Sequence, residues 1–283
     1  MDETRNANFV NLHTHTTYCD GTAHPSDFIL KAKQLSWDFL GFSAHAPLPF
    51  PCEWSIKESE LPNYTSEIHQ LAEMHKSEIK IHSSFEIDFL DGLGFPSLKF
   101  EEIKKSTYLI TSIHFVPNPK ADELKYLEID GTYSQFLLAL KSYDFDLKKL
   151  LQSFLGATEQ MLSTPIGCVK IIGHIDKIIL NASKTSEFLE LENWFYDELF
   201  QIALNSTSQF DFIEINTRAM YKKGLSNPYP KLEFIAKLHQ NNIPLIINSD
   251  AHHPSELDGG YSNLHQLLIQ CGLKDIEKTK MEL

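Results

Sequence analysis

Histidines and carboxylates are the residues of this chain whose types and spacing could do chemistry, and 13 histidines occur among its 283 residues. His13 and His15 stand two positions apart, and Asp20 follows them closely. Side chains two positions apart on an extended chain point to the same face, so the two imidazoles could bind one metal ion together. Imidazole and carboxylate ligands suit Zn, Mn or Fe, and no thiolate accompanies them as in most structural zinc sites.

An alternation of strands and helices must position these residues. Short runs rich in Ile, Val and Phe predict seven strands, at Phe9–His13, Phe39–Ser43, Ile79–Ile87, Tyr108–Ile113, Val169–Gly173, Phe210–Asn216 and Pro244–Asn248. Helical patterns between them predict helices at Pro25–Leu35, Leu61–Lys76, Phe145–Ser163, Ser186–Ser206 and Pro230–Asn241. Such alternation favours parallel strands with helices outside. Seven units favour a closed or nearly closed α/β barrel, a single domain over residues 1–283, and an open doubly wound sheet is the alternative.

Residues that bind metals stand where the predicted strands end. In an α/β barrel, the carboxyl ends of the strands converge on the mouth where active sites lie. Chance would scatter the histidines over helices and loops, yet they recur at these ends. We therefore predict one multinuclear metal site with the ligands His13, His15, Asp20, His45, Glu86, His114, His174, Asp250 and His252.

The remaining histidines do not fit this pattern. His24 and His253 lie close enough to the predicted ligands to support them or to replace one of them. His82 stands in mid-strand, and we expect it in the core. Those in helical segments are expected to be solvated, namely His69, His75, His239 and His265.

Two long connections, Pro47–Ser59 and Phe115–Tyr143, interrupt the alternation. Long loops at one end of a barrel usually carry the site or cover it. Their aromatic residues Phe50, Trp54 and Phe115 either wall a pocket or serve packing alone.

Composition and charge limit the function classes. The 25 basic and 38 acidic residues give a net charge of −13, which repels nucleic-acid backbones and anionic membranes. In this acidic chain Arg218, Lys222 and Lys223 form a basic cluster, which is either a solvated loop or a phosphate clamp. The planar guanidinium of Arg218 suits bidentate binding of an oxyanion.

The sequence has no run of 18 apolar residues and no apolar segment of the signal-peptide kind, so we expect neither a transmembrane helix nor a secretory leader. The four cysteines are scattered and predict no disulfide framework. A reducing cytoplasm is therefore the expected location.

Read in order, these residues resemble the polymerase-and-histidinol-phosphatase (PHP) family. His13-x-His15 followed by Asp20-Gly21 begins the similarity, which covers nearly the whole chain. Several stretches are similar to the histidinol-phosphate phosphatases of that family, namely His45–Pro49, Glu86–Phe89, Ser112–Phe115, Gly173–Asp176, Glu214–Thr217 and Ser249–Pro254. The resemblance implies a distorted, TIM-like (β/α)7 barrel and hydrolysis of a small phosphorylated substrate, above all L-histidinol phosphate in histidine biosynthesis.

The resemblance also implies how two or three divalent metal ions are held. Glu86 would bridge the first two ions. The first would be bound by His13, His15, Glu86 and Asp250, the second by Glu86, His114 and His174, and the third by Asp20, His45 and His252. Whether Asp20 or His24 completes the third set stays open. Asp250 is the best candidate for proton transfer, His252 the second, and Arg218 the candidate for phosphate binding.

Other functions remain open at this point. The substrate could be another small phosphomonoester, a nucleotide or phosphotyrosine. An amidohydrolase also uses an HxH pair, although Asp250 and His252 on one turn, with Glu86 as a bridge, favour phosphoester cleavage. A metal-holding regulatory module without turnover is a different class, but no position of the ligand set is missing.

Overall fold

Seven parallel strands form a barrel in the computed structural model, which describes residues 10–121, 125–273 and 276. The strand order follows the chain, β1-β2-β3-β4-β7-β8-β9. The bounds are β1 Val10–Asn11, β2 Phe39–His45, β3 Lys80–Asp88, β4 Tyr108–Ser112, β7 Val169–Ile172, β8 Phe212–Asn216 and β9 Leu245–Asn248. All seven predicted strands are confirmed, although Phe9 lies outside the described residues.

The barrel closes where β1 meets β9, so the open doubly wound sheet is not the fold. Thr14 forms a parallel bridge with Ala251 just beyond the two strands. Below that bridge, two side-chain amides connect β1 and β9 in place of backbone-to-backbone hydrogen bonds. Asn248 Oδ1 accepts from the Leu12 N–H at 2.8 Å, and Asn11 Oδ1 accepts from the Ser249 N–H at 2.9 Å.

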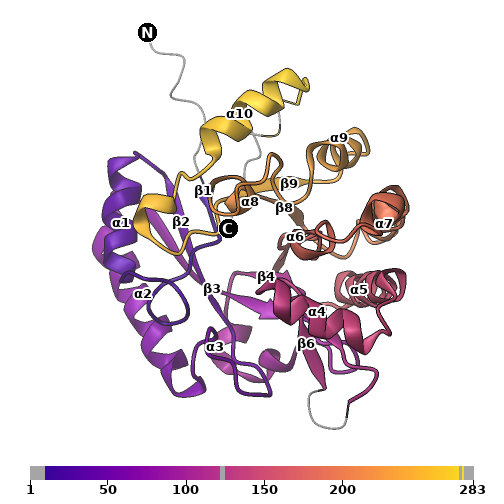
Figure 1. Ribbon diagram of the computed structural model, residues 1–283. Helices are drawn as coiled ribbons and strands as arrows, with labels where there is room; N and C mark the ends of the chain where they lie inside the picture. The colour runs from indigo at the N-terminus through magenta and orange to yellow at the C-terminus, as the bar shows by residue number, and fades with distance from the viewer. Residues whose placement is uncertain (1–9, 122–124, 274–275, 277–283) are drawn as a thin grey trace.

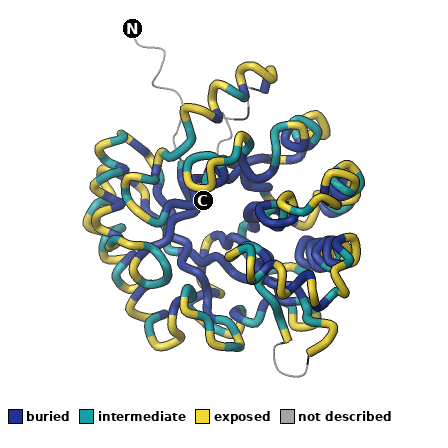
Figure 2. The backbone as a smooth tube through the Cα atoms, in the orientation of Figure 1, coloured by how far each residue is buried: buried dark blue, intermediate teal, exposed yellow. Residues whose placement is uncertain are grey.

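Helices surround the barrel, and each turns its buried side inward (Figures 1 and 2). In α1, for example, Phe28, Ile29 and Ala32 are buried at helical spacing. The longer helices are α1 Pro25–Gln34, α2 Leu61–His75, α4 Tyr133–Ser142, α5 Leu147–Ser163, α7 Phe188–Asn205, α9 Leu232–Gln240 and α10 Tyr261–Gln270. Short ones are α3 Glu101–Lys104, α6 Ile179–Ala182 and α8 Arg218–Tyr221. None of the helices in the described part of the chain has the length and apolar character needed to span a bilayer.

The connection Phe115–Tyr143 is more structured than a long loop. It contains a hairpin of β5 Phe115–Pro117 and β6 Tyr126–Glu128, and then the whole of α4. Thr132 caps α4 through a capping box with Gln135. β6 therefore belongs to a hairpin that precedes α4 rather than to an irregular loop.

His82 was predicted to lie in the core, and this prediction is wrong. It is part-buried, and its ring stacks on Phe39 of the neighbouring strand at 6.4 Å. Among the histidines expected to be solvated, His69 and His265 are exposed, whereas His75 and His239 are part-buried.

A small apolar layer fills the barrel below its mouth. Leu12, Tyr108, Ile110, Ile171 and Ile246 form it, each from a different position on the barrel wall. Tyr108 crosses the interior and donates a hydrogen bond from Oη to the Leu12 carbonyl at 2.8 Å. Gly41 leaves room for this phenol, because a Cβ there would lie 2.0 Å from Tyr108 Oη.

We expect Gly41→Ala to lower the free energy of unfolding by about 1–3 kcal/mol, because the added methyl group overpacks the barrel interior. Gly156, within α5, is the matched control, since nothing lies within 4 Å of a Cβ built there. Gly156→Ala should raise stability by roughly 0.5–1 kcal/mol through helix propensity. Urea unfolding measures both, and equal effects would contradict the packing described.

Candidate metal centre

All nine predicted ligands meet at the carboxyl end of the barrel. Their nitrogen and oxygen atoms form four overlapping groups, and within each group the atoms lie within 4.8 Å of one another. The groups are His13–Glu86–His174, His13–His15–Asp250, His45–Glu86–His114 and His15–Asp20–His45–His252. Segments from every part of the chain therefore converge as the strand-end pattern predicts.

Glu86, near the end of β3, lies at the centre of this cluster. Its Oε2 is 3.1 Å from His13 Nε2 and 3.1 Å from His45 Nδ1. Its Oε1 is 2.9 Å from His174 Nε2 and 3.5 Å from His114 Nε2. A carboxylate with imidazoles on both oxygens has the arrangement of a bridging ligand.

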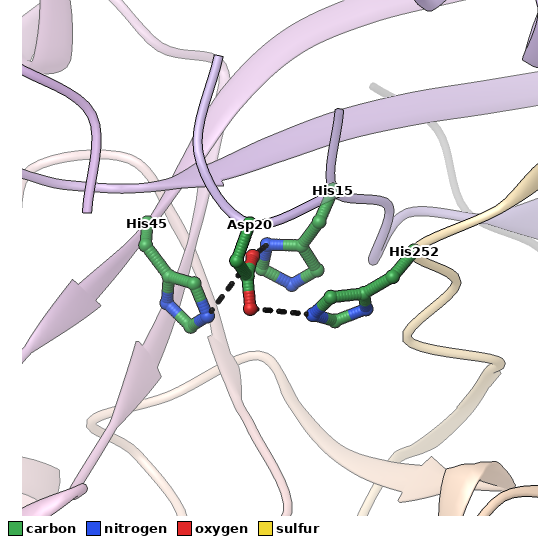
Figure 3. Close-up of side chains that lie close together, drawn as sticks. All are labelled: His15, Asp20, His45 and His252. Atoms are coloured by element: carbon green, nitrogen blue, oxygen red, sulfur yellow. Dashed lines mark hydrogen bonds and ion pairs between the residues drawn. The ribbon is translucent and has the colours of Figure 1, made fainter. Parts of the chain in front are cut away.

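Asp20 lies among three imidazoles at the outer side of the cluster (Figure 3). Its carboxylate oxygens are 2.9 Å from His252 Nε2, 3.6 Å from His15 Nδ1 and 3.9 Å from His45 Nε2. Burial alone would raise the pKa of Asp20, but the surrounding imidazoles, His45 first, lower it. This oxygen–nitrogen group has the composition of a third cation site.

His24 and His253 lie outside these groups. His24 is exposed at the start of α1, where its backbone N–H donates to Asp27 at 3.2 Å. His253 is also exposed and accepts a hydrogen bond from the Ser255 N–H at 3.2 Å. The structure thus brings Asp20, and not His24, to the group of three imidazoles.

The donor atoms fit divalent cations. Four buried atoms of the nine predicted ligands have no hydrogen-bond partner among the described residues, and they are His15 Nε2, Asp20 Oδ1, His45 Nδ1 and His114 Nε2. Buried polar atoms are normally paired, so unpaired ones aimed at one place indicate a ligand. Burial lowers the pKa of His15 to about 4 and holds that of His45 well below its usual range, which leaves both rings neutral as ligands must be.

The carboxylates are ionised in this environment. Burial alone would raise the pKa of Glu86, but His45 and His13 hold it well below its usual range. Asp250 is likewise buried, and His13 and His15 hold its pKa well below the usual range. Neutral imidazoles around ionised carboxylates are the protonation state that metal binding requires.

Two further carboxylates orient the imidazoles, and sequence reasoning missed this role for both. Glu214 Oε1 is 2.7 Å from His13 Nδ1, and Asp88 Oδ1 is 2.8 Å from His114 Nδ1. These contacts direct Nε2 of each ring toward Glu86. Only Asp88 carried a signal in the sequence, because it stands two positions after Glu86 and strand residues two apart share a face.

The same carboxylates raise the pKa of the rings they hold. Burial lowers the pKa of His13, but Glu214, Asp250 and Glu86 together raise it well above its usual value. Burial also lowers the pKa of His114, but Asp88, Asp130 and Glu86 together raise it to about 9. A metal ion must displace protons from these two rings, so binding is coupled to pH.

A cavity of about 130 Å³ opens beside the cluster. Arg218 and Lys223 line it, but Lys222 does not, because its exposed side chain pairs with Glu256 at 2.6 Å. Lys177, which the sequence analysis missed, also lines the cavity and lies one turn after His174. The basic cluster at the site is therefore composed of Lys177, Arg218 and Lys223.

Of the three predicted aromatic residues, only Trp54 lines the cavity. Its ring lies edge-on to His45 at 4.5 Å and stacks on Phe115 at 5.7 Å. Phe50 packs in turn against Phe115 at 5.2 Å. Phe50 and Phe115 thus support Trp54 from behind.

The protein is thus a barrel of seven parallel strands with a cluster of histidines and carboxylates at its mouth that could hold metal ions. Residues 11–218 match the PHP domain, which is most of the chain, and the protein belongs to this family. It is similar to the probable histidinol-phosphatase of Deinococcus radiodurans, with 23% identity over 87% of this chain and 86% of that protein.

Two crystal structures share the fold. A protein of Listeria monocytogenes, provisionally named a histidinol phosphatase, matches with a TM-score of 0.75 and 21% identity over 90% of this chain and 99% of that one. The histidinol phosphate phosphatase of Lactococcus lactis, complexed with Zn, L-histidinol and phosphate, matches with a TM-score of 0.66 and 17% identity over 95% and 94% of the two chains. These matches confirm the (β/α)7 barrel.

We expect Glu214→Gln to weaken metal binding about 10- to 100-fold, because the imidazole of His13 loses the carboxylate that orients it. Competition with a chelator of known affinity measures this without any assay of turnover. Glu198→Gln, at an exposed position of α7, is the control and should bind metal like the wild type. Unchanged affinity in Glu214→Gln would show that this carboxylate does not support the centre.

Proposed function

We propose that this protein is a metal-dependent phosphomonoesterase that hydrolyses L-histidinol phosphate to L-histidinol and phosphate in histidine biosynthesis. The observation that carries the proposal is the convergence of the nine predicted ligands in one cluster, beside a cavity that three cationic side chains line. The similarity to proteins named histidinol-phosphatase supports the choice of substrate. The free, scattered cysteines support a reducing cytoplasm as its location.

Two or three divalent ions, Zn, Mn or Fe, would be held by the cluster. The three sets follow the resemblance, with Glu86 common to the first and second and Asp20 in the third. When bound, such ions supply a water molecule that ionises near neutral pH and neutralise charge on the phosphoryl oxygens. Proton transfer and binding of the phosphoryl oxygens are assigned to side chains of the protein itself.

Asp250 is the proposed acceptor of a proton from the attacking water. Its Oδ1 lies 3.4 Å from His15 Nε2, and its Oδ2 accepts from Asn216 Nδ2 at 3.1 Å. The backbone of Asp250 is in the left-handed region with φ of 54°, which is costly for a residue with a side chain. Arg218 Nη1 helps to hold this conformation by donating to the Asp250 carbonyl at 2.8 Å.

His252 is the second candidate for proton transfer. Its side chain lines the cavity, and Asp20 Oδ2 holds Nε2 at 2.9 Å. Arg218, Lys177 and Lys223 would bind the phosphoryl oxygens. Lys177 remains charged, because Asp130 and Asp250 outweigh the effect of burial and raise its pKa.

The substrate assignment is tested by phosphate release from the metal-loaded protein. We expect kcat/KM for L-histidinol phosphate to exceed that for nucleotides and sugar phosphates by about 100-fold or more, because a site with polar groups for one leaving alcohol rejects others. A nucleotide as the best substrate would overturn the assignment but keep the reaction. Absence of release from every phosphomonoester would overturn both.

The role of Asp250 is tested by Asp250→Asn. We expect kcat to fall by about 10²- to 10⁴-fold, because the amide cannot accept the proton. Metal content is measured alongside, since Asp250 is also a proposed ligand. His253→Gln, at the exposed neighbouring position, is the control and should keep full turnover. Full metal content together with full turnover in Asp250→Asn would refute the role.

A further inference from the structure

Glu256 contacts two residues of the cavity wall without lining the cavity itself. It is the last residue of the short 3-10 helix η4, Pro254–Glu256, and its side chain is only 11% exposed. Its Oε2 accepts a hydrogen bond from the His252 N–H at 2.9 Å and lies 3.3 Å from Arg218 Nη1. Its Oε1 accepts from Lys222 Nζ at 2.6 Å. Among the described residues, those that line the cavity include Arg218 and His252 but not Glu256.

Three protein groups hold Nη1 of Arg218. This nitrogen donates to the Asp250 carbonyl at 2.8 Å, and it lies 3.3 Å from Glu256 Oε2 and 3.5 Å from Tyr221 Oη. The Tyr221 hydroxyl in turn donates to the Ser249 carbonyl at 2.9 Å. These contacts fix one end of the guanidinium against the segment that follows β9.

The other two nitrogens of this guanidinium, Nε and Nη2, have no hydrogen bond or ion pair with any residue that the structure describes. The side chain of Arg218 is 14% exposed and lines the cavity. The N–H groups on Nε and Nη2 are parallel, and such a pair matches two oxygens of a phosphate. The edge of the guanidinium that suits a phosphate is thus the edge that the protein leaves unpaired.

The charge of Glu256 is opposite to what an anion site would select. Burial raises its pKa, but the hydrogen bonds from Lys222 and from the His252 N–H lower it below its usual value, which keeps the carboxylate ionised. A negative charge beside a phosphate site repels the ligand. Removing it should therefore strengthen phosphate binding if Glu256 acts through charge alone, and weaken phosphate binding if Glu256 holds Arg218 in place.

We propose that Glu256 is a positioning residue, which holds Arg218 by Nη1 so that Nε and Nη2 face the phosphoryl oxygens of the substrate. The same carboxylate holds the backbone of His252 and so ties the orientation of Arg218 to the segment that carries two predicted ligands. The inference rests on the proposed phosphomonoesterase function and on Arg218 as a phosphate-binding residue. It adds to them the residue that orients this arginine.

Inorganic phosphate, a product of the proposed reaction, probes Arg218 without turnover. Calorimetry on the metal-loaded protein measures its affinity for the wild type, Glu256→Gln, Arg218→Ala and the double variant. Glutamine keeps the side-chain length and an oxygen that can accept from the His252 N–H. We expect Glu256→Gln to weaken phosphate binding about 10-fold and Arg218→Ala about 10- to 100-fold, as is typical of charged hydrogen bonds. In the Arg218→Ala background, Glu256→Gln should not weaken binding further, because the two residues act as one unit.

Asp258→Asn is the matched control, because Asp258 is an exposed carboxylate two positions after Glu256 and lies 3.9 Å from Lys31. It removes the same charge and should change phosphate affinity by less than about twofold. Unchanged or tighter phosphate binding in Glu256→Gln would overturn the positioning role. Additive weakening in the double variant, or no phosphate binding to the wild type, would overturn it as well. Loss of bound metal in Glu256→Gln would do the same, since Glu256 would then act through the metal centre.

Turnover of L-histidinol phosphate separates this inference from the proposed function. Phosphate release by the wild type, with undiminished phosphate affinity in Glu256→Gln, would remove the positioning role and keep the phosphomonoesterase. The expected phosphate affinities without release from any ester would remove the phosphomonoesterase and keep Arg218 positioned at an anion site. In the active enzyme Glu256→Gln should raise KM about 10-fold and change kcat by less than about threefold. Partial unfolding would instead lower kcat and leave KM unchanged.

Discussion

The burial of one carboxylate, Glu86, is the constraint on which the site depends. An ionised carboxylate removed from water is costly unless opposite charges or hydrogen-bond donors surround it. Imidazoles from four other positions on the barrel wall supply those contacts here, and Ser112 donates a hydrogen bond to Oε1 at 2.5 Å. The barrel of parallel strands brings these distant residues to one carboxylate. Closure between β1 and β9 is therefore a condition for the centre as well as for the fold.

The sequence was sufficient for the strands and for the longer predicted helices, because burial leaves a clear apolar pattern in both. It was not sufficient for the closing seam, where the amides of Asn11 and Asn248 replace backbone pairing. Such contacts join residues over 230 positions apart and leave no local pattern. The hairpin of β5 and β6 was also missed, because its strands have three residues each and are too short for a periodic signal.

The cluster could be predicted because most of its residues lie at or shortly after the end of a strand, and strand ends are visible in the sequence. The residues around it could not be predicted in the same way. Glu214 and Lys177 have no type or spacing that marks them in one sequence, and their roles arise from which segments the barrel places side by side. Lys222 was wrongly predicted to belong to the basic cluster at the site. It is adjacent to Lys223 in the chain, but its side chain pairs with Glu256.

The central claim is that these residues bind neighbouring cations in one cavity. Crystals of the protein loaded with Zn or Mn, measured at the absorption edge of the metal, test it most directly. We expect two or three anomalous peaks, about 3.5–4 Å apart for the pair that shares Glu86, with His13 and His174 among the ligands. A single peak at another surface, or none near Glu86, would contradict it.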